Sequence, residues 1–248
     1  MARKGKAREL STRIEQQFAR DILKLMTPAR QLLRAMKAQD RMRADAARAD
    51  QLPDITGALV GFIRDMIPRA AAERIAKRQM LRIERFGRVD FERWSELAGI
   101  DPKEAKGRAA AQVDVTIAAA IEEAVNYIQD IPAKLAQQVS QEFNEALLRG
   151  ERGASLTKIF EERLNVAQSR AKMIARDQST KALGNVQKVR QQALGVSKYE
   201  WVTAGDERVR PSHAALNGKV FSWDAPPAVG HPGADINCRC VAVAVFDD

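Results

Sequence analysis

The sequence has 248 residues, a formal net charge of +9 at pH 7, and 45% hydrophobic but only 5% aromatic residues. This apolar fraction excludes a disordered tail, and two cysteines spaced as C-x-C cannot form a disulfide framework for a chain of this size. No run of about 18 apolar residues occurs, and the basic start "MARKGKAREL" lacks the apolar core of a secretory signal. We therefore expect a soluble protein made in the cytoplasm, with no membrane partner. The abundance of Ala, Gln, Arg and Lys favours helices.

The first part of the chain shows the spacing of amphipathic helices. From residue 9 to about residue 49, apolar side chains recur every three or four positions. The stretch "TPAR" interrupts this pattern, where Thr27 can cap a second helix and Pro28 suits its first turn. Another apolar stripe ends before Pro68, and we expect long helices up to Phe86.

The segment 86–108, "FGRVDFERWSELAGIDPKEAKGR", differs from the helical stretches around it. Glycines and a proline interrupt it repeatedly, which predicts a hinge or a protruding element. Helical spacing resumes over 113–131, is expected to stop at Pro132, and then continues to a terminator at Gly150. Basic helices are predicted for residues 155–195.

Roughly the last fifty residues change from helical to strand-like spacing. "KYEWVTA" alternates along a strand, "GKVFSW" follows an Asn-Gly turn, and "CVAVAVF" is β-branched and apolar. These stretches predict strands near 199–203, 219–223 and 238–245, whose packing buries Trp201 and Trp223. The predicted fold class is therefore α+β, with long α-helices for about the first 195 residues and then a small β-containing module.

The positive charge is concentrated in two helical segments. Residues 1–50 contain 13 Lys and Arg against 6 Asp and Glu, and residues 151–197 contain 9 against 4. The rest of the chain is nearly balanced or slightly acidic. Basic segments of this kind can contact nucleic acid or an acidic protein surface, and a solvated helix face with an Arg bias explains them equally well.

The side chains best suited to bind a metal lie near the C-terminal end, and they are His213, His231, Cys238 and Cys240. Zinc takes thiolate and imidazole ligands in a tetrahedron, and alternate residues of a strand share one face, so a structural zinc site is one hypothesis. The alternative needs no metal, because His213 can bond to Asp206 or to a backbone carbonyl while the cysteines pack in the core. In both cases the four residues should converge around Asp206 and Asn237.

The loop "GDERVRPSH" contains both carboxylate and guanidinium side chains, which predict a structural network. The residues expected in this network are Asp206, Arg208, Arg210, Asn237 and Arg239. Guanidinium groups pair bidentately with carboxylates, so the loop arginines should reach Asp235 or Asp224; substrate binding is the alternative role. Arg239 alternates with the cysteines and should point to the opposite face of the strand.

Several spaced motifs occur in one order in the C-terminal part of the chain. They are "IAR" at 174–176, "WVT" at 201–203, "DERVRPSH" at 206–213, a glycine before a strand at Gly218, and "HPGADINCRC" at 231–240. Together they resemble the C-terminal domain of the phage Mu F-like minor head proteins, also called head morphogenesis proteins, of tailed bacteriophages. The helix departs from the family at Asp177-Gln178, where Thr-Glu is common, so a role tied to that glutamate does not carry over.

The resemblance implies a low-copy structural protein of the virion head, assembled in the cytoplasm of the bacterial host. It also implies a variable helical region over 1–150, which contacts the portal protein, the major capsid protein or packaged DNA. A Mu F-like domain over 151–248 follows, with basic helices at 155–195 and a β module at 198–248. Some members of the family carry a further toxin or enzyme domain, and none is expected here because the sequence ends eight residues after Cys240.

Two rival functions come from the residues themselves. A metal-dependent nuclease or a Cys/His hydrolase could use the residues His213, His231, Asn237 and Cys238. The sequence contains no H-E-x-x-H, P-loop or G-x-S-x-G motif, so we expect a protein that is not an enzyme. A DNA-binding regulator rests on the basic helices alone and lacks a recognisable helix-turn-helix.

Overall fold

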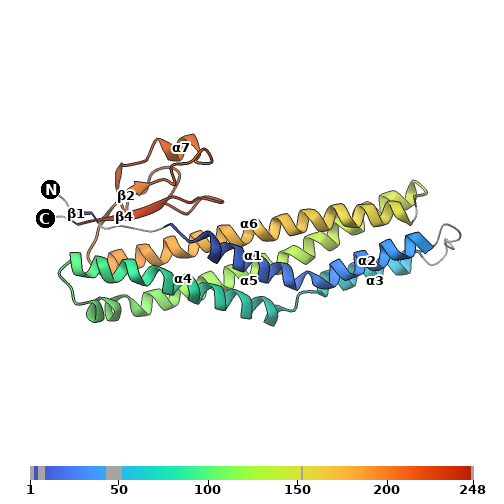
Figure 1. Cartoon of the computed structure of the whole chain (residues 1–248), viewed down its shortest axis with the longest axis horizontal. Coiled ribbons are helices and arrows are strands. Elements are labelled where there is room, and N and C mark those ends of the chain that lie inside the picture. Colours follow the sequence, from blue (N-terminus) through green and yellow to red (C-terminus); the bar gives the residue numbers. More distant parts are fainter. Residues whose placement is uncertain (1–2, 5–8, 43–51, 152, 247–248) are drawn as a thin grey trace. The chain divides into compact units, whose positions relative to one another are not determined.

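The computed structural model describes residues 3–4, 9–42, 52–151 and 153–246, most of which are helical (Figure 1). In chain order the elements are β1 (Arg3–Lys4), α1 (Thr12–Leu25), α2 (Thr27–Met42), α3 (Leu52–Asp65), α4 (Arg69–Leu97), α5 (Pro102–Leu148), α6 (Ala154–Ala193), β2 (Lys198–Val202), α7 (Pro211–Ala214), β3 (Val220–Ser222) and β4 (Val241–Phe246). The predicted α+β fold, with long helices followed by a small sheet, is confirmed. The end of the first predicted helical stretch, residues 43–49, lies outside the described residues. None of the described helices combines the length and apolar character of a membrane span.

The chain forms two compact units, and each unit combines segments that are distant in the sequence. The helical unit comprises Phe18–Ile75 and Ala124–Ile174. The sheet-containing unit comprises Met1–Gln17, Ala76–Glu123 and Ala175–Asp248. Each of these units contains residues from both of the predicted segments, 1–150 and 151–248, so the two segments divide the sequence and not the structure.

Apolar side chains at helical spacing form the core of the helical unit. Its fully buried members include Phe18, Ile22, Met26, Ile63, Ile128 and Phe160. Ion pairs connect α5 and α6 at the margin of this core: Arg163 Nε lies 2.8 Å from a carboxylate oxygen of Glu142, and Arg170 Nη2 lies 2.5 Å from Asp130 Oδ2. The side chains of these pairs are partly exposed, so the buried apolar stripe contributes most of the stability of this unit.

Helix α5 continues through Pro132, so the predicted helix end at this residue is wrong. An internal proline removes one hydrogen bond and costs about 3 kcal/mol. The apolar stripe passes across the proline, however, because Ile128, Ile131 and Leu135 are all buried. Burying side chains of this size gains about 1.5–3 kcal/mol each, which outweighs the local cost.

Helix α4 extends to Leu97, so the prediction of a hinge or protruding element over 86–108 is also wrong. Phe91 and Trp94 are buried on this last part of α4. At Gly87 a Cβ atom would lie 3.0 Å from Arg190 Nη1 and 3.2 Å from Leu183 Cδ1, so the glycine provides space for α6. The break between α4 and α5 is short, because α4 ends at Leu97 and α5 begins at Pro102. Asp101 Oδ1 caps α5 by accepting from the backbone amides of residues 103 and 104.

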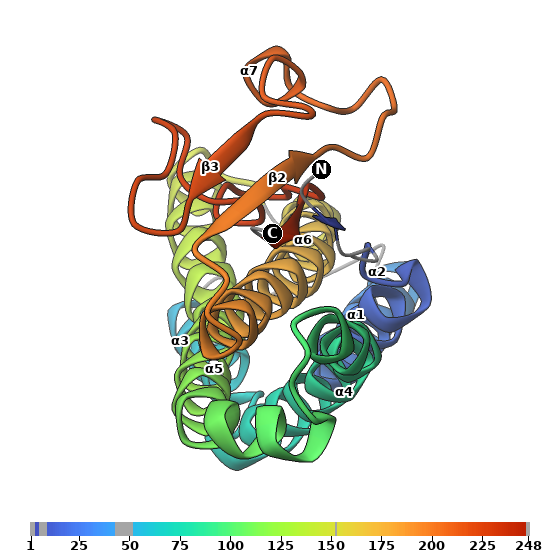
Figure 2. The same ribbon diagram turned by 90° about the vertical axis from the view of Figure 1, so that its left-hand side faces the viewer.

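The four short strands form an antiparallel sheet in the order β1-β4-β2-β3. Tyr199 in β2 pairs with Phe221 on one side and Ala244 on the other, and Figure 2 shows β2 and β3 side by side. The prediction that Trp201 and Trp223 are core residues is confirmed, because both are buried with Tyr199 and the two cysteines. The third predicted strand begins later than expected, at Val241, and β1 was not predicted.

Helix α6 supports the sheet through a buried amide and a close backbone approach. The Gln191 side chain is fully buried, donates to the carbonyl oxygen of Ala242 at 3.0 Å, and accepts from the indole N–H of Trp223 at 3.2 Å. Farther along the helix, a Cβ atom at Gly184 would lie 3.0 Å from the carbonyl oxygen of Pro232. The loop that carries "HPGADINCRC" therefore lies directly on the backbone of α6.

A methyl group at Gly184 should weaken this docking. We expect Gly184→Ala to destabilise the sheet-containing unit by about 1–3 kcal/mol, because the carbonyl of Pro232 must move to admit a Cβ atom. Urea unfolding followed by tryptophan fluorescence measures the change. Gly107→Ala on α5 is the matched control, because nothing lies within 4 Å of its Cβ position, and it should stabilise by about 0.5–1 kcal/mol. Equal effects of the two substitutions would contradict the close approach.

Candidate functional site

The structure brings His213, Cys238 and Cys240 together inside the sheet-containing unit. His213 Nδ1 lies 3.5 Å from Cys238 Sγ and 3.6 Å from Cys240 Sγ. The three potential ligand atoms all lie within 4.8 Å of one another. These side chains are 2%, 3% and 7% exposed, respectively, so this His-Cys-Cys cluster is closed to bulk solvent.

Local structure explains how each member of the cluster is positioned. His213 belongs to the short helix α7, which begins with Pro211 after the extended residue Arg210, and its ring packs edge-on against Trp201 with centroids 5.3 Å apart. The cysteines lie in the extended segment immediately before β4, where alternate side chains share one face. The Cys-Arg-Cys alternation therefore directs both sulfurs toward the same imidazole nitrogen.

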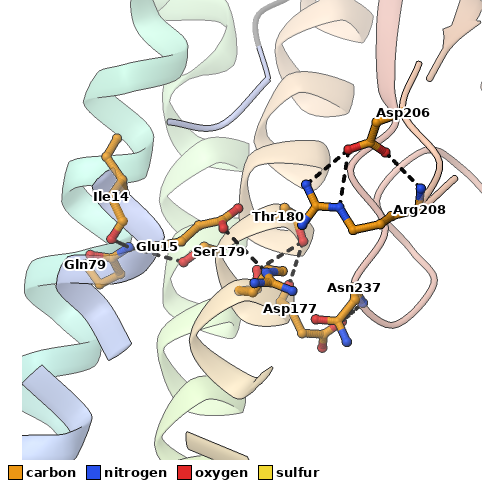
Figure 3. A network of polar contacts seen from close by, with 10 residues as sticks. Ile14, Glu15, Gln79, Asp177, Ser179, Thr180, Asp206, Arg208 and Asn237 are labelled. Carbon is orange, nitrogen blue, oxygen red and sulfur yellow. Dashed lines mark hydrogen bonds and ion pairs between the residues drawn. The ribbon is translucent and has the colours of Figure 1, made fainter. Parts of the chain in front are cut away.

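A turn at Asn237 leads the chain into this segment. Asn237 has a positive φ of 57°, a conformation in which asparagine is among the more readily accepted residues. Its amide N–H donates to Asp177 Oδ1 on α6 at 3.1 Å (Figure 3). Asp177 is buried and also pairs with Lys181 at 2.9 Å. This carboxylate holds the turn against α6 and so fixes where Cys238 begins.

The second nitrogen of His213 faces a carboxylate. Asp235 Oδ2 lies 3.0 Å from His213 Nε2, in place of the predicted bond to Asp206 or to a backbone carbonyl. An ionised carboxylate only accepts hydrogen bonds, so in the neutral imidazole Nε2 carries the proton. The lone pair of Nδ1 then points toward the two sulfurs, which is the orientation that a metal ligand or a general base requires.

The two thiols affect each other's protonation. A hydrogen bond from Cys240 lowers the pKa of Cys238, and the backbone amides of Cys240 and Gly233 favour the Cys238 thiolate further. The pKa of Cys240 is raised by its bond to Cys238 and by burial. The Gly233 amide, which donates to Cys238 Sγ at 3.4 Å, thus favours negative charge on Cys238.

His231 lies apart from the cluster, in contact with Tyr199, Trp223 and Lys188. Its Nδ1 lies 3.0 Å from Tyr199 Oη, and its Nε2 lies 3.3 Å from Lys188 Nζ. The ammonium group only donates, so Nε2 accepts from Lys188. Burial and the nearby Lys188 charge lower the pKa of His231. Three of the four predicted ligands are thus brought together, and the fourth is engaged elsewhere.

The predicted arginine network divides into two parts. Asp206 accepts from Arg239 at 2.5 Å, and it accepts from Arg208 at 3.1 Å (Figure 3). These bonds lower the pKa of Asp206 to about 2. Arg210 instead donates to the carbonyl oxygen of Ile236 at 2.7 Å, and its guanidinium lies 3.8 Å from Asp235. Both parts tie the 205–210 loop to the 235–239 segment.

Three supporting residues were missed or underestimated in the sequence. Gln191 was not singled out, Asp177 was named only as a departure from the family pattern, and Asp235 was considered only as a partner for arginine. Asp177 lies three positions after the buried Ile174, so a carboxylate on an apolar helix face was a detectable signal. Gln191 offered no comparable signal, because its role depends on Ala242, which is 51 positions away in the sequence.

The sequence of the C-terminal part of the chain matches a known family. Residues 137–243 match the family described as Phage Mu protein F like protein. This match confirms the resemblance that the C-terminal motifs indicated, and it marks a Mu F-like region over 137–243. The Mu F-like family suggests a protein of phage head morphogenesis.

Two curated proteins are similar to part of the chain. An uncharacterized protein of Haemophilus influenzae is 36% identical over 125 residues, which are 50% of this chain and 28% of that protein. NAD(+)--arginine ADP-ribosyltransferase EFV of Enterococcus faecalis is 27% identical over 129 residues, which are 46% of this chain and 26% of that protein. The chain therefore spans about a quarter of the length of these relatives. No solved structure matches it.

The lowered pKa of His231 predicts that acid destabilises the Mu F-like region. A histidine whose folded pKa lies below its unfolded value of about 6.5 resists protonation in the fold, so stability is complete above this pH and falls below it. We expect wild-type protein to lose more stability than His231→Gln between about pH 7.5 and about pH 5.5 in urea titrations. Lys188→Met should also flatten the dependence, because it removes the neighbouring charge. Identical pH dependence in all three proteins would refute the assignment.

Proposed function

We propose that the protein is a minor structural protein of a tailed-phage head, which acts in head morphogenesis at the portal vertex or on the inner surface of the capsid. The match of residues 137–243 to the Mu F-like family is the observation that carries this proposal. The Haemophilus influenzae protein is similar to half of this chain, but it is uncharacterized, so the similarity indicates no function. The host cytoplasm is the expected place of assembly.

The remaining helices supply the surface for the proposed partners, the portal protein and the major capsid protein. Residues 1–136 precede the Mu F-like region and include α1 to α4 and most of α5. Long helices present extended rows of side chains, which suits docking along another large protein surface. In this proposal the Mu F-like region is the shared module, and the preceding helices provide contacts specific to one phage.

Association with heads tests the proposal. Heads purified from cells that produce this chain with the portal and capsid proteins of its own phage should contain it at low copy, as detected by mass spectrometry. Deletion of its gene should reduce the yield of normal heads, and expression of the chain in trans should restore them. Absence of the chain from heads at every stage of assembly, together with normal heads after deletion, would refute the proposal.

Contact with packaged DNA is the second part of the proposal. Its support is the basic excess in residues 1–50 and 151–197, because lysine and arginine that neutralise phosphates release counterions and bind without sequence preference. On α6, Lys158 and Lys172 are exposed and belong to the second of these segments. DNA that fills the head would meet such side chains at high local concentration.

Salt dependence tests the DNA contact. Duplex DNA of any sequence should bind weakly at low salt, with affinity that falls steeply as salt rises. The double variant Lys158→Glu/Lys172→Glu should bind more weakly and reduce the salt slope by about 1 for each lysine that contacts phosphate. Lys103→Glu/Lys219→Glu makes the same charge change at exposed sites outside the basic segments and should affect binding less. Equal losses in both variants, or binding that ignores salt, would contradict the proposal.

The Enterococcus faecalis relative is named as an ADP-ribosyltransferase, but the chain matches 26% of that protein. A shared segment of this length is compatible with a common head-protein module attached to different partners, so we do not extend the transferase activity to this chain. The closed His-Cys-Cys cluster likewise favours a supporting role over the rival nuclease or hydrolase, since the cavity beside it measures about 20 Å³.

A further inference from the structure

The dimensions of the His-Cys-Cys cluster match those of a tetrahedral metal site. A zinc ion with bonds of about 2.3 Å to sulfur and about 2.0–2.1 Å to nitrogen separates these ligand atoms by about 3.6 Å at the tetrahedral angle. The observed separations between His213 Nδ1 and the two sulfurs are 3.5 and 3.6 Å. One ion could therefore contact the imidazole and both sulfurs with little movement of the chain.

The contacts around the cluster also resemble those around bound zinc. A histidine that binds zinc usually donates its other N–H to a carboxylate, which fixes the ring and makes the ligand nitrogen more basic. Asp235 occupies this position at 3.0 Å from His213 Nε2. The amide N–H of Gly233 donates to Cys238 Sγ at 3.4 Å, an interaction that favours a thiolate.

A cysteine nucleophile explains the same residues less well. Cys238, His213 and Asp235 have the order of contacts found in a cysteine–histidine–carboxylate triad. A nucleophilic thiolate, however, must reach its substrate, and catalytic cysteines lie in partly exposed environments. Cys238 is 3% exposed, and Cys240 competes for the same nitrogen at nearly the same distance. Two thiols at nearly equal distances from one imidazole nitrogen serve a metal better than a nucleophile.

We propose that His213 Nδ1, Cys238 Sγ and Cys240 Sγ bind one zinc ion, that Asp235 orients the imidazole, and that a water molecule completes the tetrahedron. The adjoining cavity of about 20 Å³ is large enough for one water. Asn237 lines this cavity, and its Oδ1 is buried without a hydrogen-bond partner among the described residues. A zinc-bound water could donate to this oxygen and satisfy it.

The metal acts as a clamp inside the Mu F-like region. It joins α7 to the segment before β4, two parts of the chain that are 25 residues apart at His213 and Cys238. Binding displaces the two thiol protons, which leave to solvent, while the sulfurs and the zinc keep their oxidation states. Because the sheet has a small core, metal binding would contribute directly to its folding free energy.

Metal analysis of the full chain tests the clamp. The protein is produced with zinc in the medium and purified without a metal-binding tag. It should then contain about one zinc per chain, as measured by elemental mass spectrometry. Replacement by cobalt(II) should produce the thiolate-to-cobalt charge-transfer absorption of a cysteine-bound site. A strong chelator should remove the metal and lower the unfolding midpoint of the Mu F-like region.

Substitutions distinguish the three ligands from their neighbours. Cys238→Ser, Cys240→Ser and His213→Gln should lose most of the zinc. His231→Gln is the matched control, because this second histidine lies apart from the cluster, and it should keep the zinc. Asp235→Asn should fold and bind zinc about 10–100-fold more weakly. Arg210→Gln controls for the guanidinium of Arg210, which lies 3.8 Å from Asp235, and should leave zinc affinity nearly unchanged.

Several results would overturn the proposal. They are folded wild-type protein that contains no zinc and gives no cobalt charge-transfer band, zinc that remains in both cysteine variants, and zinc lost equally from His231→Gln. Rapid alkylation of Cys238 in protein saturated with zinc would favour the cysteine nucleophile and would also overturn it. These measurements do not depend on head assembly, so a failure here leaves the proposed structural role in the phage head to its own test.

Discussion

The sheet and the loop before β4 depend on one face of helix α6. A core made mainly of Tyr199, Trp201, Trp223 and two cysteines is too small to hold these strands alone. Gln191 on α6 adds two hydrogen bonds to this core, because its buried amide satisfies both the carbonyl of Ala242 and the indole N–H of Trp223. An apolar residue at this position would leave two buried polar groups unpaired, at about 1–3 kcal/mol each.

The same helix face determines the geometry of the cluster. Gly184 lets the carbonyl of Pro232 approach the helix backbone, and Asp177 accepts from the amide N–H of Asn237 about two turns earlier on α6. Between these two contacts the chain has little freedom, so the turn at Asn237 delivers Cys238 and Cys240 to His213. The positions of the two cysteines thus follow from backbone contacts with α6. Interactions within the His-Cys-Cys cluster itself are not needed to place them.

Ion pairs have different energetic roles at the surface and in the interior of the sheet-containing unit. The half-buried Asp206 binds two arginines at the surface, an arrangement that joins loops but contributes little in water. The buried Arg190 pairs with Glu84 between α6 and α4, and burial lowers its pKa. Removing one partner of such a pair leaves an uncompensated charge, so this contact sets which helices can be neighbours.

The sequence by itself determined the periods of the helices, the α+β class, the placement of Trp201 and Trp223 in the core, and the family resemblance over the C-terminal region. These properties depend on local spacing and on residue types, which the sequence displays directly. Tertiary structure decided the continuity of α4 beyond Gly87 and of α5 through Pro132, because burial of the apolar side chains around each local break offsets its cost. It also decided that His213 and not His231 faces the cysteines. Both histidines have suitable chemistry, and only the packing of α7 and of the 231–240 loop against other elements sets which ring reaches the sulfurs.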